Sequence, residues 1–366
     1  MIARQEKVVV AMSGGVDSSV CAALLVQQGY DVQGIMMRLW SEPGQFDVAR
    51  DNRCCTRDQM IDAHLVAKKI GIPFEVIDVR DRFKQQIVDT WMDAYAAGVT
   101  PNPCLNCNRH IRFGFLLDEA LKRGADYLAT GHYARVVRSA NGTFELHKAV
   151  DAGKDQSYVL SVLTQYQLAH AMFPVGGYTK AEVREIAAGF GLRVASKSDS
   201  QDLCFVADGD YRRFLRDHLG ESGKSGDIRL TSGEIIGQHQ GLYDYTIGQR
   251  KGIGISWEEP LYVIAKDAAS NAIIVGTRDK LGTDRFIAKQ VNWIAGSPPD
   301  AEFRAEVKTR YKSRFAAGLV QPIGADRAII QLDDPVADIT AGQGAVIYLG
   351  DRVVGSGIIE TDAAAA

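Results

Sequence analysis

A glycine- and serine-rich segment near the N-terminus combines residue types that can hold a phosphate group. It runs from Val8 to Val20 and reads VVVAMSGGVDSSV, so that β-branched residues lead into Gly14 and Gly15. Because glycine has no side chain, the backbone N–H groups of such a turn can converge on one point. The apolar helix expected after the turn adds the partial positive charge of its N-terminus. The segment therefore predicts a phosphate-binding turn between a strand and a helix.

Polar side chains of this segment can add to the phosphate contacts. Ser13, Ser18 and Ser19 supply hydroxyl donors. Asp17 can either cap the helix or hold a Mg²⁺ ion that accompanies a nucleotide. The segment lacks the lysine of the GxxxxGK[ST] loop, which excludes the usual kinase and GTPase site and leaves an ordinary Gly-Ser turn as the plain alternative. SGGVDSS resembles instead the loop of the ATP pyrophosphatases, which split ATP between the α and β phosphates and leave an adenylated substrate.

Three of the six cysteines have positions that suit thiol chemistry. Cys104 and Cys107 form a CxxC in TPNPCLNCN, where prolines stiffen what we interpret as a loop just before a helix. A thiol near a helix N-terminus has its thiolate favoured, so Cys107 is a candidate nucleophile. Cys204 lies in the polar segment SKSDSQDLCFV, and we expect this loop to bring a second thiol to the first.

Other interpretations of the cysteines stay open at this point. The CxxC can be half of a zinc site, with Cys204 as third ligand and His110 or His132 as the fourth. Cys21 falls on the apolar face of the first expected helix, which indicates a core position. Cys54 and Cys55 are adjacent and rarely chelate one metal together, so we interpret them as loop or helix-start residues near the nucleotide.

The composition is that of an ordinary protein of two or three domains, with 366 residues and a formal net charge of −3. No apolar run reaches the ~20 residues that span a bilayer, and the start MIARQEKVVV does not resemble a signal peptide, so we expect a cytoplasmic protein and no membrane partner. An RNA partner would need a local basic patch. Arg304 to Arg314, RAEVKTRYKSR, is such a patch, with a solvated strand face as the alternative.

The elements that position these residues follow two patterns. Up to about residue 215, strands alternate with helices, which predicts an α/β domain with a parallel sheet. We expect strands at 8–12, 31–37, 74–78 and 127–130 and helices at 57–70, 82–97 and 109–123. Ligands of such sheets bind at the carboxyl ends of the strands. This rule places the serine-rich turn, Met37 and the segment Gly131 to Tyr133 on one rim.

Short apolar runs separated by turn residues follow from Gly220 onward, and they predict β structure. Expected strands at 303–307, 328–332, 345–349 and 353–359 suit a small barrel. The chain is thus expected to comprise an α/β domain at 1–215, a small, mostly-β central domain at 216–285 and a C-terminal β-barrel at 286–362.

Several motifs in order along the chain resemble those of the tRNA-specific 2-thiouridylases. They are SGGVDSS, TPNPCLNCN, ATGHYAR, GKDQSYVL, DSQDLCFV, YTIGQRKGIGI, TRYKS and AGQGAVIY. The resemblance implies an adenine nucleotide alpha hydrolase-like first domain and an enzyme that puts sulfur on C2 of the wobble uridine in the anticodon arm of tRNA. It also implies ATP and Mg²⁺, and a sulfur donor protein of the cysteine desulfurase or relay type.

The resemblance assigns roles to particular residues. The residues implied to bind ATP are Ala11, Met12, Ser13, Gly14, Gly15, Val16, Asp17, Ser18, Met37 and Gly131. The C2 oxygen of a flipped uracil would attack the α-phosphate. Cys204 resembles a persulfide carrier, and Cys107 resembles the second thiol, whose attack would leave a Cys107–Cys204 disulfide. The residues implied to contact tRNA are His132, Lys154, Asp155, Gln156, Arg310, Tyr311 and Gln343. Plainer alternatives are a satisfied rim histidine for His132 and a turn residue for Gln343.

One position departs from the commonest pattern of that family. Many members have aspartate where this chain has Cys104, which lies with Asn102 and Pro103 in the stretch expected near the target base. Cys104, Cys107 and Cys204 could instead hold a [4Fe–4S] cluster, as in related thiolases with the same loop. We favour persulfide chemistry. A rival function is another adenylating enzyme of this loop superfamily that acts on a small molecule, which would need neither paired thiols nor a basic C-terminal strand.

Overall fold

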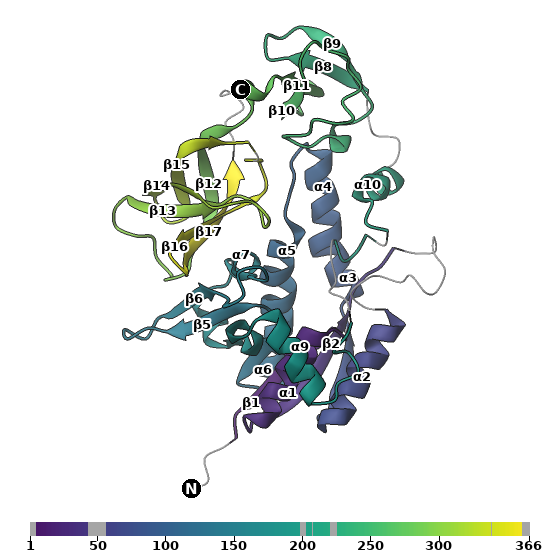
Figure 1. Ribbon diagram of the computed structural model, residues 1–366, viewed down its shortest axis with the longest axis vertical. Coiled ribbons are helices and arrows are strands. Elements are labelled where there is room, and N and C mark those ends of the chain that lie inside the picture. The colour runs from purple at the N-terminus through teal and green to yellow at the C-terminus, as the bar shows by residue number, and fades with distance from the viewer. Residues whose placement is uncertain are drawn as a thin grey trace.

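The N-terminal part of the chain is built on a five-stranded parallel sheet, as the sequence predicts (Figure 1). The computed structural model describes residues 5–42, 56–197, 203–206, 208–219, 225–337 and 339–360, so Cys54 and Cys55 lie outside the described residues. The strand order is β3-β2-β1-β4-β7. The strands are β1 (Lys7–Ala11), β2 (Asp31–Arg38), β3 (Phe74–Asp78), β4 (Tyr127–Thr130) and β7 (Ala171–Met172). β1 is therefore the central strand, and the turn that follows it lies in the middle of the edge formed by the carboxyl ends of the strands.

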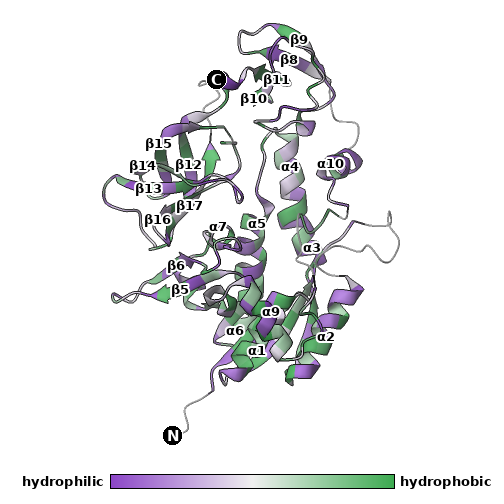
Figure 2. Cartoon of the chain, viewed as in Figure 1, coloured by the Kyte–Doolittle hydropathy of each residue, from purple (hydrophilic) through white to green (hydrophobic). Residues whose placement is uncertain are grey.

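Helices pack on both faces of this sheet because its strands are apolar on both sides. Val9 of β1 belongs to one hydrophobic cluster, whereas Val8 and Val10 belong to the cluster on the opposite face. The helices of this part are α1 (Val16–Gln27), α2 (Arg57–Ile70), α3 (Arg80–Phe83), α4 (Thr90–Ala96), α5 (Pro103–Asn106), α6 (Leu117–Lys122), α7 (Ser157–Leu160), α8 (Gln165–Ala169), α9 (Lys180–Gly189) and α10 (Tyr211–Leu219). In Figure 2, α1 is predominantly hydrophobic and α10 predominantly hydrophilic.

The helix that contains the CxxC motif begins earlier than the sequence analysis predicts. Two π-helical stretches, η2 (Lys84–Asp89) and η3 (Cys107–Leu116), join α3 to α4 and α5 to α6. The side chain of Asn102 accepts hydrogen bonds from the backbone N–H of Cys104 at 3.0 Å and of Leu105 at 3.3 Å, and Pro103 occupies the first turn. The prediction of a loop around Cys107 is therefore wrong, since both cysteines lie within the helix.

A closed six-stranded barrel forms the C-terminal part, as predicted. Its strands are β12 (Thr283–Trp293), β13 (Phe303–Lys308), β14 (Ala316–Ile323), β15 (Arg327–Val336), β16 (Gly344–Leu349) and β17 (Arg352–Glu360), and β12 pairs with β17 to close it. The hairpin of β5 (Ala134–Arg138) and β6 (Phe144–Lys148) adds to β17 through the register Leu146↔Val353. The N-terminal part and the barrel therefore share one continuous sheet.

The central part is a small β structure, also as predicted. It consists of β8 (Gly226–Leu230), β9 (Ile235–His239), β10 (Tyr262–Asp267) and β11 (Ala272–Gly276), in the order β10-β11-β8-β9. Ile228, Val263 and Ile273 are fully buried in its own hydrophobic cluster. None of the helices in the described ranges has the length and hydropathy required to cross a bilayer.

Lys266 on β10 makes stability depend on pH. Its Nζ is buried with no hydrogen-bond partner among the described residues and lies 5.9 Å from the ring centre of Tyr95 on α4. Burial lowers the pKa of Lys266 to about 8. In the unfolded chain the lysine pKa is about 10.4, so between about pH 8 and that value the unfolded state binds more protons than the folded state. The free energy of unfolding should therefore rise with pH across this range. Below about pH 8, Lys266 is charged in the folded state as well, and the cost of burying this charge lowers the free energy of unfolding in full.

Lys266→Met should accordingly raise the free energy of unfolding at neutral pH by about 2 to 3 kcal/mol, because it removes the buried ammonium. Urea unfolding of both proteins between about pH 7 and about pH 10.5 measures this, and the advantage should vanish at the upper end. Lys280→Met, at an exposed side chain, is the matched control. An advantage of Lys266→Met that is constant over the whole pH range would contradict the assignment.

Candidate active site

The turn between β1 and α1 depends on two glycines that lie close to other backbone segments. Gly14 has φ +72°, and a Cβ there would lie 2.2 Å from the carbonyl oxygen of Gln59 on α2. A Cβ at Gly131, which follows β4, would lie 2.6 Å from the backbone nitrogen of Ser18. Gly15 is the N-cap of α1 and supplies no side-chain hydrogen bond. The turn is thus held compactly, and the first-turn N–H groups of α1 remain for an anion.

Hydrogen bonds from serine hydroxyls and from Lys197 hold the turn between β1 and α1 in shape. The Ser18 hydroxyl accepts from the backbone N–H of Ser13 at 3.1 Å, and Ser19 Oγ donates to the Gly15 carbonyl at 2.8 Å. Lys197 Nζ donates to the Gly14 carbonyl at 3.0 Å and to Asp62 Oδ2 at 2.8 Å. The positive end of Lys197 therefore lies beside the turn, although the turn has no lysine of its own.

Asp17 lies in the first turn of α1 but does not cap it. Its carboxylate accepts from Lys180 Nζ at 2.7 and 2.9 Å and from the hydroxyl of Tyr133 at 2.7 Å. The capping alternative for Asp17 is therefore wrong. Sequence reasoning missed Lys180 and Tyr133, because their link to Asp17 joins residues more than a hundred positions apart.

The expected rim residues lie at the carboxyl ends of the two strands that flank β1. Met37 is in β2 and Gly131 follows β4, and both strands pair with β1. His132 Nδ1 lies 2.7 Å from Thr130 Oγ1, and its ring contacts those of Phe113 and Phe173. Burial, reinforced by Arg112, lowers the pKa of His132 to about 3. The ring is therefore neutral at physiological pH and brings no charge to the rim.

The segment at 154–156 is bonded to the same rim. Gln156 accepts from the backbone N–H of Tyr133 through Oε1 at 3.0 Å and donates its own N–H to the Tyr133 carbonyl at 2.8 Å. Asp155 accepts from the backbone N–H of Ala149 and from the hydroxyl of Ser157. Asp155 and Gln156 thus hold the segment in place, with Lys154 in the same turn.

Cys107 and Cys204 belong to the same hydrophobic cluster. Cys107 is 6% exposed and Cys204 is half-buried, and the cluster also contains Phe83, Trp91 and Phe205. Cys104 is exposed and lies near the barrel, where its charge raises the pKa of Tyr311, after the larger effect of burial and that of Asp155. No group of three or more His, Cys, Asp or Glu side chains that could hold a metal ion occurs among the described residues.

The barrel contacts the chain just before the CxxC helix. The side chain of Gln343 donates to the Thr100 carbonyl at 2.9 Å, and the Thr100 N–H donates to the Ala341 carbonyl at 3.2 Å. Arg310 donates to Thr340, and the ring of Tyr311 lies 6.1 Å from that of Tyr158 on α7. Gln343 therefore acts as an interface residue between the barrel and the segment that leads into the CxxC helix.

The basic segment predicted at 304–314 is only partly available for ligands. Arg304 pairs with Asp333 at 2.5 Å, so this end of the segment is satisfied within the barrel. Arg310 is half-buried, and its Nε has no hydrogen-bond partner in the described part of the chain. Lys312 and Arg314 are exposed. The basic character is thus concentrated at the C-terminal end of the segment.

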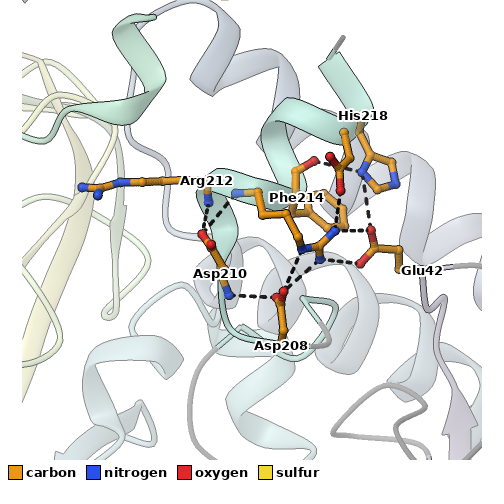
Figure 3. A network of polar contacts seen from close by, with 8 residues as sticks. Glu42, Asp208, Asp210, Arg212, Phe214 and His218 are labelled. Carbon is orange, nitrogen blue, oxygen red and sulfur yellow. Dashed lines mark hydrogen bonds and ion pairs between the residues drawn. The ribbon is translucent and has the colours of Figure 1, made fainter. Parts of the chain in front are cut away.

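A polar network around Arg213 holds α10 in place (Figure 3), and Phe214 and Leu215 of this helix belong to the hydrophobic cluster that contains Cys107. Arg213 binds Glu42 at 2.8 Å, Asp208 at 2.7 Å and Asp217 at 2.7 Å, and the Glu42 side chain is only 3% exposed. Because Asp208 follows Cys204 by a few residues and Glu42 follows β2, the network joins both segments to α10. Sequence reasoning gave no signal for it.

Comparison with known proteins covers nearly the whole chain. A family model described as tRNA methyl transferase HUP domain matches residues 6–208, one described as tRNA methyl transferase PRC-barrel domain matches residues 212–277, and one described as aminomethyltransferase beta-barrel domain matches residues 283–359.

Relatives match the chain from end to end and have a consistent name. A tRNA-specific 2-thiouridylase MnmA from Geotalea uraniireducens is 46% identical over 364 residues, covering 98% of this chain and 96% of the relative. A protein of the same name from Geobacter metallireducens is 44% identical over 363 residues, covering 97% of each chain. Such identity over full-length chains confirms the resemblance found in the motifs, and the chain belongs to the family of tRNA-specific 2-thiouridylases.

Proposed function

We propose that this enzyme transfers sulfur to C2 of the wobble uridine of tRNA and consumes ATP to give 2-thiouridine, AMP and pyrophosphate. The supporting observation is that one chain combines a phosphate-binding turn with two thiols, Cys107 and Cys204, in one hydrophobic cluster. The names of the relatives agree with this activity. The family-model descriptions mention methyl transfer, but a phosphate-binding turn and paired thiols suit adenylation and sulfur transfer.

ATP is the substrate of the first step, and we assign it to residues 11–18, Met37 and Gly131. The uracil C2 oxygen attacks the α-phosphorus, the bond to the β-phosphate breaks and pyrophosphate leaves. The N–H groups at the start of α1 orient the phosphates, as the helix N-terminus favours negative charge. Asp17 would hold the Mg²⁺ that accompanies ATP, in place of its ion pair with Lys180.

Sulfur transfer follows on the adenylated base. A donor protein of the cysteine desulfurase or relay class loads Cys204 as a persulfide. The Cys107 thiolate attacks Cys204 Sγ, so that a disulfide forms and the terminal sulfur leaves as sulfide. The two thiols are oxidised by two electrons and the transferred sulfur is reduced by two. Sulfide then attacks C2, the C–O bond breaks and AMP departs, after which a cellular thiol reductant restores Cys107 and Cys204.

The described residues give no support to a [4Fe–4S] cluster on Cys104, Cys107 and Cys204, because they contain no group of three or more His, Cys, Asp or Glu side chains that could hold a metal ion. Cys104 lies near Tyr311 of the barrel, whereas the other two thiols lie in the cluster that contains Trp91 and Phe205. We therefore derive no step through iron. The rival function, adenylation of a small molecule, leaves the thiol pair and the basic end of the barrel segment without a role.

The three parts divide the work in this proposal. Residues 1–215 carry out the chemistry, and residues 216–285 and 286–362 contact the anticodon arm. His132, Lys154, Arg310 and Tyr311 would contact the RNA at the junction between the first part and the barrel. The enzyme would work in the cytoplasm, where tRNA and ATP are available.

Incubation of the purified chain with ATP, Mg²⁺, an unmodified tRNA transcript and a cysteine desulfurase with its cysteine substrate, in the absence of air, tests the proposal. We expect AMP and 2-thiouridine in equal amounts, measured by nucleoside mass spectrometry. A transcript with cytidine at the wobble position is the control, because it lacks the target base. Formation of AMP with a small molecule but not with tRNA would favour the rival function.

A further inference from the structure

Two lysines converge on one exposed aromatic ring at the edge of the barrel. Lys148 Nζ, at the end of β6, lies 4.0 Å from the ring centre of Phe315, and Lys308 Nζ, at the end of β13, lies 5.1 Å from it. Phe315 is 38% exposed. Its ring meets that of Tyr348 of β16 edge-on at 5.2 Å, which fixes the orientation of the Phe315 ring.

The charges around this ring are unbalanced. Among the described residues, the one ion pair of Lys148 is a long one, with Glu306 at 3.9 Å. Lys308 has no ion pair in the described ranges. The charge of Asp155 favours its protonated form, and the charge of Lys148 disfavours it. Lys312 and Arg314, on the turn between β13 and β14, are exposed. Two ammonium groups held over one ring repel each other, and an anion between them would relieve that repulsion.

The position of this patch connects it to the site of chemistry. Lys308 Nζ also lies 5.8 Å from the ring centre of Tyr311, and Tyr311 interacts electrostatically with Cys104. Tyr348 lies 3.2 Å, hydroxyl to hydroxyl, from Ser157, which is next to the segment at 154–156. The patch therefore begins where the expected tRNA contacts end.

We propose that Phe315, Lys148 and Lys308 form a nucleotide-binding platform for an unpaired nucleotide of the tRNA arm that holds the target uridine. The base contacts the part of the Phe315 ring that the lysines leave exposed, and the adjoining phosphate lies between the two ammonium groups. This rests on the proposed function and extends its tRNA contacts beyond Arg310 and Tyr311. Stacking on an aromatic side chain with nearby lysines is how proteins commonly hold unpaired RNA.

Tests of the platform measure tRNA affinity and thiolation separately. Phe315→Leu keeps the apolar packing on Tyr348 but removes the stacking surface, and it should weaken binding of the transcript about tenfold. Phe315→Tyr retains a ring and should bind like the wild type. In the double variant Lys148→Gln/Lys308→Gln, the slope of log Kd against log salt concentration should fall by roughly one. Tyr166→Ala, at an aromatic residue 58% exposed on α8, is the matched control.

The outcomes distinguish this inference from the proposed function. If the wild type makes 2-thiouridine but Phe315→Leu binds the transcript as tightly as Phe315→Tyr, the platform is refuted while the function stands. Equal weakening in Phe315→Leu and Phe315→Tyr, with lower melting temperatures for both, would assign Phe315 to packing alone and would also refute it. Failure of the wild type to thiolate any transcript counts against the function, and the affinity series still decides whether the platform binds RNA.

Discussion

Cys204→Ser is expected to abolish 2-thiouridine formation, with a loss of at least about a thousandfold, while pyrophosphate release in the first turnover persists. A serine hydroxyl cannot form a persulfide, so no sulfide is released to the adenylated base, but the turn at 11–18 and its contacts are untouched. Single-turnover assays with ATP and transcript, on enzyme first treated with a cysteine desulfurase and cysteine to load the persulfide, are read as pyrophosphate and as 2-thiouridine and separate the two steps. Loss of both products would place Cys204 in nucleotide or tRNA binding instead of sulfur transfer.

The companion variant Cys104→Ser separates two-thiol from three-thiol chemistry. A persulfide mechanism needs Cys107 and Cys204 only, so Cys104→Ser should retain thiolation to within about tenfold. An iron–sulfur cluster needs all three thiolates and would lose activity in either variant. Iron and sulfide assays on protein purified without air provide a second measurement. Bound iron in the wild type that disappears in Cys104→Ser would overturn the assignment made from the positions of the three cysteines.

The parallel sheet was predictable because the relevant signals are local. Apolar runs such as Val8 to Val10 are buried on both faces, as their lack of polar alternation indicates. A glycine-rich turn after such a strand predicts a ligand site at the carboxyl end of the sheet. The early start of the CxxC helix was also available from the sequence, since Asn102 followed by Pro103 is a typical N-cap and first-turn pair.

The contacts that orient the site were not predictable, because they join distant parts of the chain. The ion pair of Asp17 with Lys180 spans 163 positions, and the hydrogen bond of Gln343 to Thr100 spans 243. Likewise, β6 pairs with β17 across a similar separation. The CxxC motif gives the spacing of two thiols along one helix, but packing of the barrel places Cys104 beside Tyr311.

Substitution of Gly131, the glycine that follows β4, is expected to have the second large effect, on ATP binding. Gly131→Ala should weaken ATP binding on the order of a hundredfold, since displacement by about 1 Å at a bound substrate can cost that much. Its new methyl group would lie 2.6 Å from the Ser18 nitrogen and 2.7 Å from the Asp17 carbonyl carbon, so the segment after β4 must move away from α1. Gly177→Ala is the matched control, because a Cβ there meets nothing within 4 Å. Nucleotide titration, with melting curves to verify folding, measures both variants. If Gly131→Ala binds ATP as Gly177→Ala does, the nucleotide does not depend on the close approach of these two segments, and the assigned site must be moved away from Gly131.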